Sequence, residues 1–153
     1  MGRMYSATFE LVAATAAQDL FEINAPADAA VVVHGLWLSQ SSDVGDAASE
    51  MLNILIHRGS TSGSGGSTPT AAPLSLGDAA FGGTVEANNT TQSTEGTILF
   101  SWDWHIAAGF QWIPTPEMRP IISPSGRLII EMQSTPADSL TLSGTVVFEE
   151  IGG

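Results

Sequence analysis

Apolar and polar side chains alternate with a period of two along much of this chain. The alternation is clearest over residues 5–11, 51–57, 98–106 and 140–148. Successive side chains of a β-strand point to opposite faces, so this period predicts strands that turn one face towards a core. In residues 98–106, for example, Ile98, Phe100, Trp102 and Trp104 fall on the same side. The pattern therefore predicts a protein built from half-buried strands.

Other segments complete the expected set of strands. Residues 31–39 form an almost continuous apolar run rich in valine, which is typical of a strand covered on both faces. Shorter strands are predicted over residues 20–23, 83–87, 110–113, 120–122 and 128–132. No segment predicts a long helix, and glycine or proline turn signals separate the strands. About eight to nine strands of this kind indicate an all-β fold, an antiparallel β-sandwich.

A tract rich in glycine, serine and threonine occupies residues 59–70 and has nothing apolar to bury. Such a composition predicts an exposed, flexible loop at about residues 59–73. A linker between two domains is the alternative interpretation, but the residues before the tract are few for a free-standing domain. We therefore expect a single domain over residues 1–153.

The charge balance excludes several classes of partner. The chain has sixteen acidic residues and only four basic ones, Arg3, Arg58, Arg119 and Arg127, which gives a formal net charge of −12. Nucleic acids and anionic membranes attract basic surfaces, so neither is an expected partner. The chain has no cysteine, which excludes disulfides, thiolate metal sites and cysteine nucleophiles. No apolar stretch approaches the roughly 20 residues of a membrane span, and no signal peptide is expected.

Metal ligands and catalytic groups are not predicted. His34, His57 and His105 lie in three separate predicted strands, without the clustering typical of a zinc site. We interpret each as a structural strand residue and expect no cofactor and no metal. Asp103 and His105 share a strand face and suggest a hydrolytic triad, but no Gly-x-Ser-x-Gly motif accompanies them. The sequence therefore predicts a protein that is not an enzyme and has no catalytic residues.

Two surface features leave alternatives open. Asp43, Asp46 and Glu50 gather three carboxylates in one turn, which suggests calcium, although their spacing differs from that of an EF-hand. Four tryptophans, Trp37, Trp102, Trp104 and Trp112, suggest a platform for sugar rings. Trp102 and Trp104 share a face with other apolar residues, which favours a core or a subunit interface instead.

Several short stretches resemble the decoration, or cement, proteins on the heads of tailed bacteriophages. These stretches are residues 5–10 (Tyr-Ser-Ala-Thr-Phe-Glu), 17–23 (Ala-Gln-Asp-Leu-Phe-Glu-Ile), the serine and acidic turn before Met51, the loop through residues 65–70, 112–117 (Trp-Ile-Pro-Thr-Pro-Glu) and 137–144 (Ala-Asp-Ser-Leu-Thr-Leu-Ser-Gly). They are spread over most of the chain but contain no catalytic signature. Together with the strand count, the resemblance favours a jelly-roll topology.

The resemblance implies a structural virion protein located on the outer surface of the capsid. It would bind the major capsid protein, associate with itself as a homo-oligomer, as a trimer, and stabilise the phage head. A tail or fibre component is a related alternative. A carbohydrate-binding, lectin-like β-sandwich is the alternative from a different functional class, and an enzyme with a dispersed hydrolytic site is a third.

Overall fold

The computed structural model describes residues 2–42 and 50–152, and these residues are almost entirely β-strand and loop. The strands are β1 (Arg3–Ala14), β2 (Gln18–Asn24), β3 (Ala29–Gln40), β4 (Met51–His57), β5 (Ala72–Pro73), β6 (Thr84–Asn89), β7 (Ile98–His105), β8 (Phe110–Trp112), β9 (Ile121–Ile122), β10 (Arg127–Met132) and β11 (Leu140–Gly152). One short 3-10 helix, η1 (Pro116–Met118), lies between β8 and β9. The described part of the chain contains no helix that is long and apolar enough to span a membrane.

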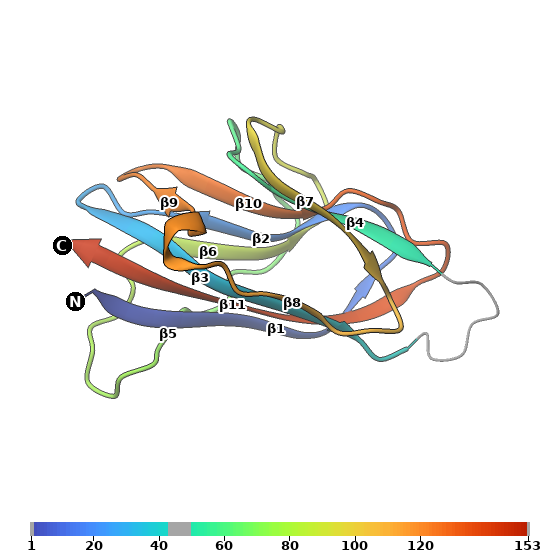
Figure 1. Cartoon of the computed structure of the whole chain (residues 1–153), viewed down its shortest axis with the longest axis horizontal. Helices are drawn as coiled ribbons and strands as arrows, with labels where there is room; N and C mark the ends of the chain where they lie inside the picture. The colour runs from blue at the N-terminus through green and yellow to red at the C-terminus, as the bar shows by residue number, and fades with distance from the viewer. Residues whose placement is uncertain (1, 43–49, 153) are drawn as a thin grey trace.

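The strands form two antiparallel sheets that pack face to face (Figure 1). Sheet A has the order β5-β1-β11-β3-β8, and β9 pairs with β3 beside β8. Sheet B has the order β6-β2-β10-β4-β7. The predicted all-β antiparallel sandwich is therefore confirmed, with eleven strands in the described residues.

Eight of these strands are paired in a nested order. If the short or inserted strands β5, β6 and β9 are set aside, the first strand pairs with the last, β1 with β11, and the second with the seventh, β2 with β10. The third strand, β3, pairs with the sixth, β8, and the fourth, β4, pairs with the fifth, β7. An eight-stranded, two-sheet arrangement of this kind is a jelly roll. The topology favoured by the strand count and the resemblance is the one observed.

The inward side chains of both sheets build one hydrophobic cluster between them. Strand β11 shows the underlying pattern, because its residues alternate between buried and half-buried from Leu140 to Glu150. Aromatic rings close one end of the core, where Phe81 contacts both Tyr5 and Phe148 with ring centroids 5.4 and 4.9 Å apart. The tryptophans expected in the core or an interface, Trp102, Trp104 and Trp112, pack at the other side with Phe100 and Phe110.

The outer face of sheet A is open, which differs from the expectation for residues 31–39. The inward residues of β3 are buried, but Val32, His34 and Trp37 point to the other face and are only half-buried. The apolar run predicted a strand covered on both faces. No described segment fills the place of that second cover over these residues, so their partial burial comes from neighbouring side chains of the same sheet.

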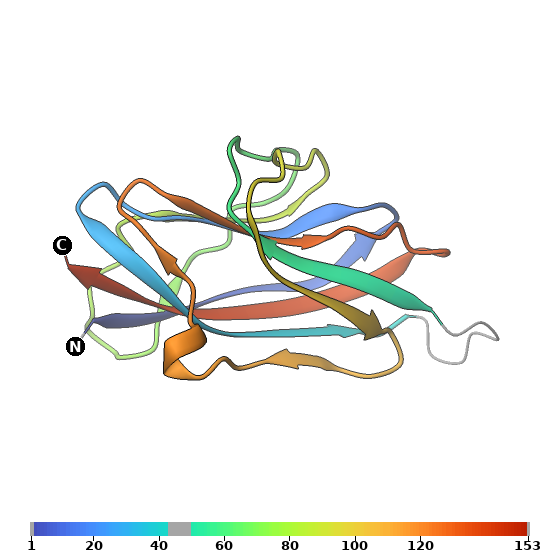
Figure 2. The same ribbon diagram turned by 45° about the horizontal axis from the view of Figure 1, so that its top comes forward.

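The outer face of sheet B is partly covered by the long connection between β4 and β7. Its two ends, near residues 58–64 and 90–97, lie side by side above the sheet in both views (Figures 1 and 2). Backbone hydrogen bonds join them, among them Arg58 N to Thr97 O at 3.0 Å and Ser64 N to Thr91 O at 2.9 Å. The predicted glycine-rich loop is mostly exposed, but Gly63 within it is buried against the sheet.

The two ends of the jelly roll meet at the same end of the sandwich (Figure 1). Strands β1 and β11 run antiparallel, with Arg3 opposite Glu150. The Arg3 guanidinium lies 2.7 Å from the Glu150 carboxylate, and Gly82 N donates to the other oxygen of that carboxylate at 3.1 Å. The first and last strands are therefore joined by both backbone pairing and side-chain contacts.

Candidate functional site

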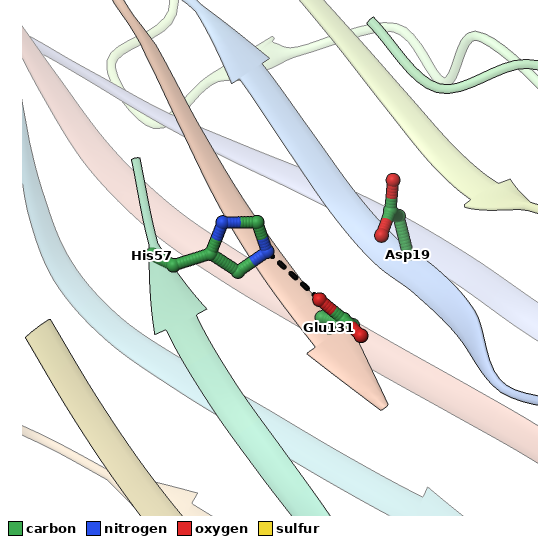
Figure 3. Close-up of side chains that lie close together, drawn as sticks. All are labelled: Asp19, His57 and Glu131. Carbon is green, nitrogen blue, oxygen red and sulfur yellow. Dashed lines mark hydrogen bonds and ion pairs between the residues drawn. The ribbon is translucent and has the colours of Figure 1, made fainter. Parts of the chain in front are cut away.

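Three ionisable side chains meet on the outer face of sheet B: Asp19 of β2, His57 of β4 and Glu131 of β10 (Figure 3). One potential metal-ligating atom from each lies within 4.8 Å of those of the other two. Asp19 and His57 have no solvent exposure, and Glu131 is 6% exposed. Charged side chains are seldom fully buried unless they are paired. The hydrogen-bond and ion-pair partners of these three side chains therefore need to be identified.

A β-bulge brings Asp19 to this face. Glu131 is opposite Asp19, but the preceding residue, Ile130, is opposite Phe21, so that Leu20 is the extra residue. Leu20 and Phe21 both enter the hydrophobic core. The bulge thus places Asp19 on the same face as Glu131, whereas an unbroken strand would have turned it towards the core with Phe21.

His57 reaches the group from the neighbouring strand. It is opposite Ile129 in the ladder, so Glu131 is its diagonal neighbour on the same face. The His57 Nε2 atom lies 2.8 Å from Oε2 of Glu131. Figure 3 shows the imidazole and the Glu131 carboxylate pointing towards one another, with the Asp19 carboxylate beside them on the far side of Glu131.

Two consecutive residues of the covering connection hold the carboxylates. Gln92 Nε2 donates to Oε1 of Glu131 at 2.7 Å, and Ser93 N donates to Oδ2 of Asp19 at 2.7 Å. The remaining oxygen of Asp19, Oδ1, is buried and has no hydrogen-bond partner among the described residues. An unpaired buried carboxylate oxygen is costly, since nothing replaces the water that it has lost.

The electrostatics of the group follow from burial and from the close carboxylates. Burial and the charge of Glu131 raise the pKa of Asp19 to about 6, although the hydrogen bonds from Ser93 and the charge of His57 oppose the rise. Burial opposes protonation of His57, but its hydrogen bond to Glu131 and the charge of that carboxylate outweigh burial and raise the pKa of the imidazole. Asp19 and His57 therefore each hold a proton more tightly than the isolated side chain does.

A third buried carboxylate anchors the covering connection nearby. Glu22 of β2 accepts hydrogen bonds from Ser62 Oγ at 2.7 Å and Gly63 N at 2.9 Å, and it pairs with Arg127 Nε at 2.8 Å. The predicted exposed loop is therefore tied to the sheet at its centre through a fully buried side chain. These hydrogen bonds to Glu22 hold the covering connection in place above Asp19.

The other residues considered from sequence are not brought together. His34 pairs with Glu149 at 3.0 Å on the outer face of sheet A. The Nδ1 atom of His105 accepts from Ala107 N at 3.2 Å, and Asp103 accepts from Asn53 Nδ2 at 2.9 Å. The proposed pairing of Asp103 and His105 therefore has no hydrogen bond between the two in the described structure.

The possible calcium turn lies mostly outside the described residues, which exclude Asp43 and Asp46. Glu50, its third carboxylate, accepts a hydrogen bond from Ala137 N at 2.5 Å.

Sequence reasoning missed Asp19 and Glu131 and assigned His57 a structural role alone. A signal was present for Glu131, because it interrupts the strongly apolar segment Leu-Ile-Ile-Glu-Met, whereas Asp19 stands in the half-polar segment Gln-Asp-Leu-Phe-Glu-Ile. A charged side chain in a strand that is covered on both faces must be paired with another charge or hydrogen-bonded. The identity of that partner required the sheet order and the bulge.

No protein-family model matches the chain, and no curated protein matches it. Among solved structures, the chain is similar to one from maize chlorotic mottle virus, studied by single-particle analysis, with 14% identity, a TM-score of 0.27, and coverage of 99% of this chain and 95% of that chain. A chain from the structure of infectious bursal disease virus, Gt strain, has 12% identity and a TM-score of 0.16, with coverage of 100% of this chain and 39% of that chain. Similarities at such low TM-scores carry no argument about function.

Proposed function

We propose that this protein is a non-catalytic structural protein of a virion, a decoration or cement protein that binds the outer surface of a phage head as a homo-oligomer. The jelly-roll fold is compatible with this role, since the fold occurs in capsid proteins as well as in lectins and cupins. Fold alone does not decide function, however. The observation that carries the proposal is the placement of exposed apolar side chains at both edges of sheet A.

One apolar edge follows β5. Leu74 is 57% exposed and Leu76 is fully exposed. The segment that carries them is held in place, because Leu74 N donates to Met4 O at 2.8 Å and the Tyr5 hydroxyl donates to Ala79 O at 2.9 Å. We call Leu74 and Leu76 the β5 patch. A fixed loop that presents leucines to water is typical of a contact surface.

The opposite edge of the sheet carries the second patch. Ile113 after β8, Met118 in η1 and Ile121 in β9 are each more than half exposed. We call these three residues the β9 patch. Arg119 follows Met118, and Arg58 donates to Ile121 O at 3.2 Å, so two of the four arginines of the chain lie here. Asp78 and Arg3 both line the hollow beside the β5 patch, so the apolar side chains rather than charges carry the proposed contact.

Two different apolar patches on opposite edges suit a head-to-tail contact. In such a heterologous interface the β5 patch of one copy covers the β9 patch of the next, and a ring forms if the rotation closes. The edge strands β5 and β9 have two residues each, so side chains rather than a continuous ladder would make the contact. A closed trimer would then stabilise a capsid by binding only its assembled form.

Light scattering coupled to size exclusion, over a range of concentrations, tests the oligomer. The wild-type protein is expected as a trimer, and Leu76→Asp and Ile121→Asp are each expected as monomers. Leu11→Asp is the matched control, because Leu11 is 67% exposed but lies away from both patches. Mixing the two monomeric variants should give a heterodimer, because each retains the patch that the other has lost. Mixtures that stay monomeric would overturn the head-to-tail arrangement.

Binding to capsids tests the function itself. Purified protein is added to phage heads that lack a decoration protein, and its retention after gradient sedimentation is measured together with the temperature of head disruption. Saturable retention and a higher disruption temperature for the wild type, both reduced in Leu76→Asp, are expected. A protein that neither binds nor stabilises such heads would contradict the decoration role.

A lectin-like function is the second candidate, because a shallow hollow of about 730 Å³ lies on the open face of sheet A. Trp37 lines it together with polar residues that include Glu10, Gln111 and Ser143. An aromatic ring beside hydroxyl, amide and carboxylate groups is suited to a sugar ring. A glycan array with the wild type and Trp37→Ala separates this candidate from the first, since glycan binding that the substitution removes would favour the lectin.

A further inference from the structure

We propose that Asp19, His57 and Glu131 form a binding site for one divalent transition-metal ion of the Zn²⁺ type. The site is independent of the proposed capsid role. It rests on the arrangement of three ligating side chains from three strands, and on the buried Oδ1 of Asp19 that has no partner among the described residues.

The ligand chemistry selects the class of ion. One imidazole nitrogen and two carboxylate oxygens suit Zn²⁺, which takes nitrogen and oxygen ligands in tetrahedral sites with a water as the fourth. Calcium prefers six to eight oxygen ligands, and magnesium retains several waters, so neither fits one nitrogen and two oxygens in a closed space. The described structure thus favours an imidazole-binding ion over a hard one.

The distances require only small side-chain rotations. The ligating atoms lie within 4.8 Å of one another, and ligands of a tetrahedral zinc ion lie roughly 3.4 Å apart. His57 Nε2 and Glu131 Oε2, now 2.8 Å apart, must separate slightly, and Asp19 must approach. The Asp19 carboxylate stands beside the pair in Figure 3, and binding of one ion requires it to rotate towards them.

Charge also favours a divalent ion. Without a metal, two carboxylates and one protonated imidazole leave a net negative charge on buried side chains. A divalent ion with the two carboxylates and a neutral imidazole gives a neutral group. The His57 Nε2 atom must present its lone pair to the ion, so a proton carried there has to leave for the solvent, and metal affinity depends on pH.

The contacts around the two carboxylates resemble those of a metal centre, whereas Nδ1 of His57 has no hydrogen-bond partner among the described residues. Gln92 orients Glu131 through Oε1 and leaves Oε2 directed at His57, while Ser93 N binds Oδ2 of Asp19 and leaves Oδ1 unpaired. Groups that hold ligating carboxylates in this way commonly change metal affinity by about 10- to 100-fold when removed. Gln92 is therefore a positioning residue for the site.

The test uses the full chain, freed of metal with a chelator and then titrated with Zn²⁺ alone. Competition with a chromophoric chelator gives the affinity, elemental mass spectrometry gives the stoichiometry, and calorimetry in two buffers gives the protons released. One ion for each chain and release of protons are expected. Zn²⁺ should also raise the thermal midpoint, because it binds the folded site.

Four variants make the outcome decisive. Asp19→Asn and His57→Gln should each weaken binding more than about 100-fold, and Gln92→Ala about 10- to 100-fold. His34→Asn is the matched control, since His34 also pairs with a glutamate but has no third ligand, and it should bind Zn²⁺ as the wild type does. Circular dichroism establishes that each variant is folded.

Three results would overturn the site: substoichiometric Zn²⁺, unchanged affinity in folded Asp19→Asn, or tighter binding of Ca²⁺ or Mg²⁺ than of Zn²⁺. If His57→Gln does not fold, Asp19→Asn and Gln92→Ala still decide the question. Neither the oligomeric state nor the binding of capsids enters these measurements, so failure of this site would leave the proposed function standing.

Discussion

The Nε atom of Arg127 lies 2.8 Å from Oε1 of Glu22 on the outer face of sheet B, and the same carboxylate accepts Gly63 N from the covering connection. One buried side chain therefore joins strand β10 to the loop that closes over Asp19. Substitution of Glu22 by glutamine keeps the shape but removes the charge.

We expect Glu22→Gln to lower the free energy of unfolding by about 1 to 3 kcal/mol, because Arg127 loses its ion pair and keeps only its hydrogen bond to Asn24, and because hydrogen bonds to a neutral amide are weaker. Urea denaturation measures the change, and hydrogen exchange at the Gly63 amide should become faster. Glu10→Gln, on an exposed glutamate, is the control and should change stability little. Equal stability of the two variants would refute the anchoring role of Glu22.

Stability of the metal-free protein should fall as the pH rises. The pKa of Asp19 is raised from 3.8 to about 6 in the folded state, so the folded protein binds more protons than the unfolded chain between these values. Stability is therefore lost between about pH 4 and pH 6, by on the order of 3 kcal/mol. The raised pKa of His57 acts in the same direction, since its contribution is lost as the pH rises through the folded pKa.

Urea midpoints from pH 4 to pH 8 in the presence of a chelator check this dependence. Asp19→Asn should flatten the profile between pH 4 and pH 6 and should be more stable than the wild type at pH 8. A wild-type stability that increases over that range, with no effect of the substitution, would contradict the assignment to Asp19.

Gly144 of β11 has no room for a side chain. A Cβ atom there would lie 2.7 Å from the Phe9 ring and 2.9 Å from a Leu38 methyl group. Overpacking of this kind costs about 1 to 3 kcal/mol, so Gly144→Val should lower the thermal midpoint despite the high β-propensity of valine. Thr141→Val, at an outward-facing position of the same strand, is the control and should have little effect. A similar loss there would indicate that any valine in β11 is destabilising.

Phe81 holds the inserted segment against the core. Its ring contacts Tyr5 and Phe148 but is only partly buried, so Phe81→Ala should lower stability by about 1 to 3 kcal/mol, less than the loss of a fully buried ring. The same change should loosen the segment that carries Leu76 and weaken self-association. Phe81→Leu retains more of the buried area and should lose less on both measurements. If stability falls but self-association is unchanged, the β5 patch does not depend on Phe81 for its position.

Much of the fold could be predicted because most strands keep one face in the core. The alternation of Leu140, Leu142 and Val146 predicted β11, and that of Leu128, Ile130 and Met132 predicted β10, with the faces observed. Period-two patterns record burial on one side of a strand. No pattern in the sequence indicates which strands pair with one another, so the prediction of a jelly roll depended on the strand count and the resemblance.

The candidate site could not be predicted for a local reason. A strict alternation through β2 places Asp19 with Phe21 in the core, and only the bulge at Leu20 turns it to the other face beside Glu131. A bulge leaves little trace in a single sequence, because the extra residue is as apolar as its neighbours. Part of the cover over the site came from the glycine-rich tract, whose composition predicted exposure alone, and the rest came from the polar residues Gln92 and Ser93.

The nested pairing has a consequence for synthesis on the ribosome. Strand β1 pairs mainly with β11. Arg3 cannot pair with Glu150 until that residue has been synthesised, 147 residues later. At about 5 to 20 residues per second this delay lasts roughly 7 to 30 s. Throughout that time the edge of β1 is available to strands of other nascent chains, so crowding of ribosomes on one message favours exchange of β1 between copies.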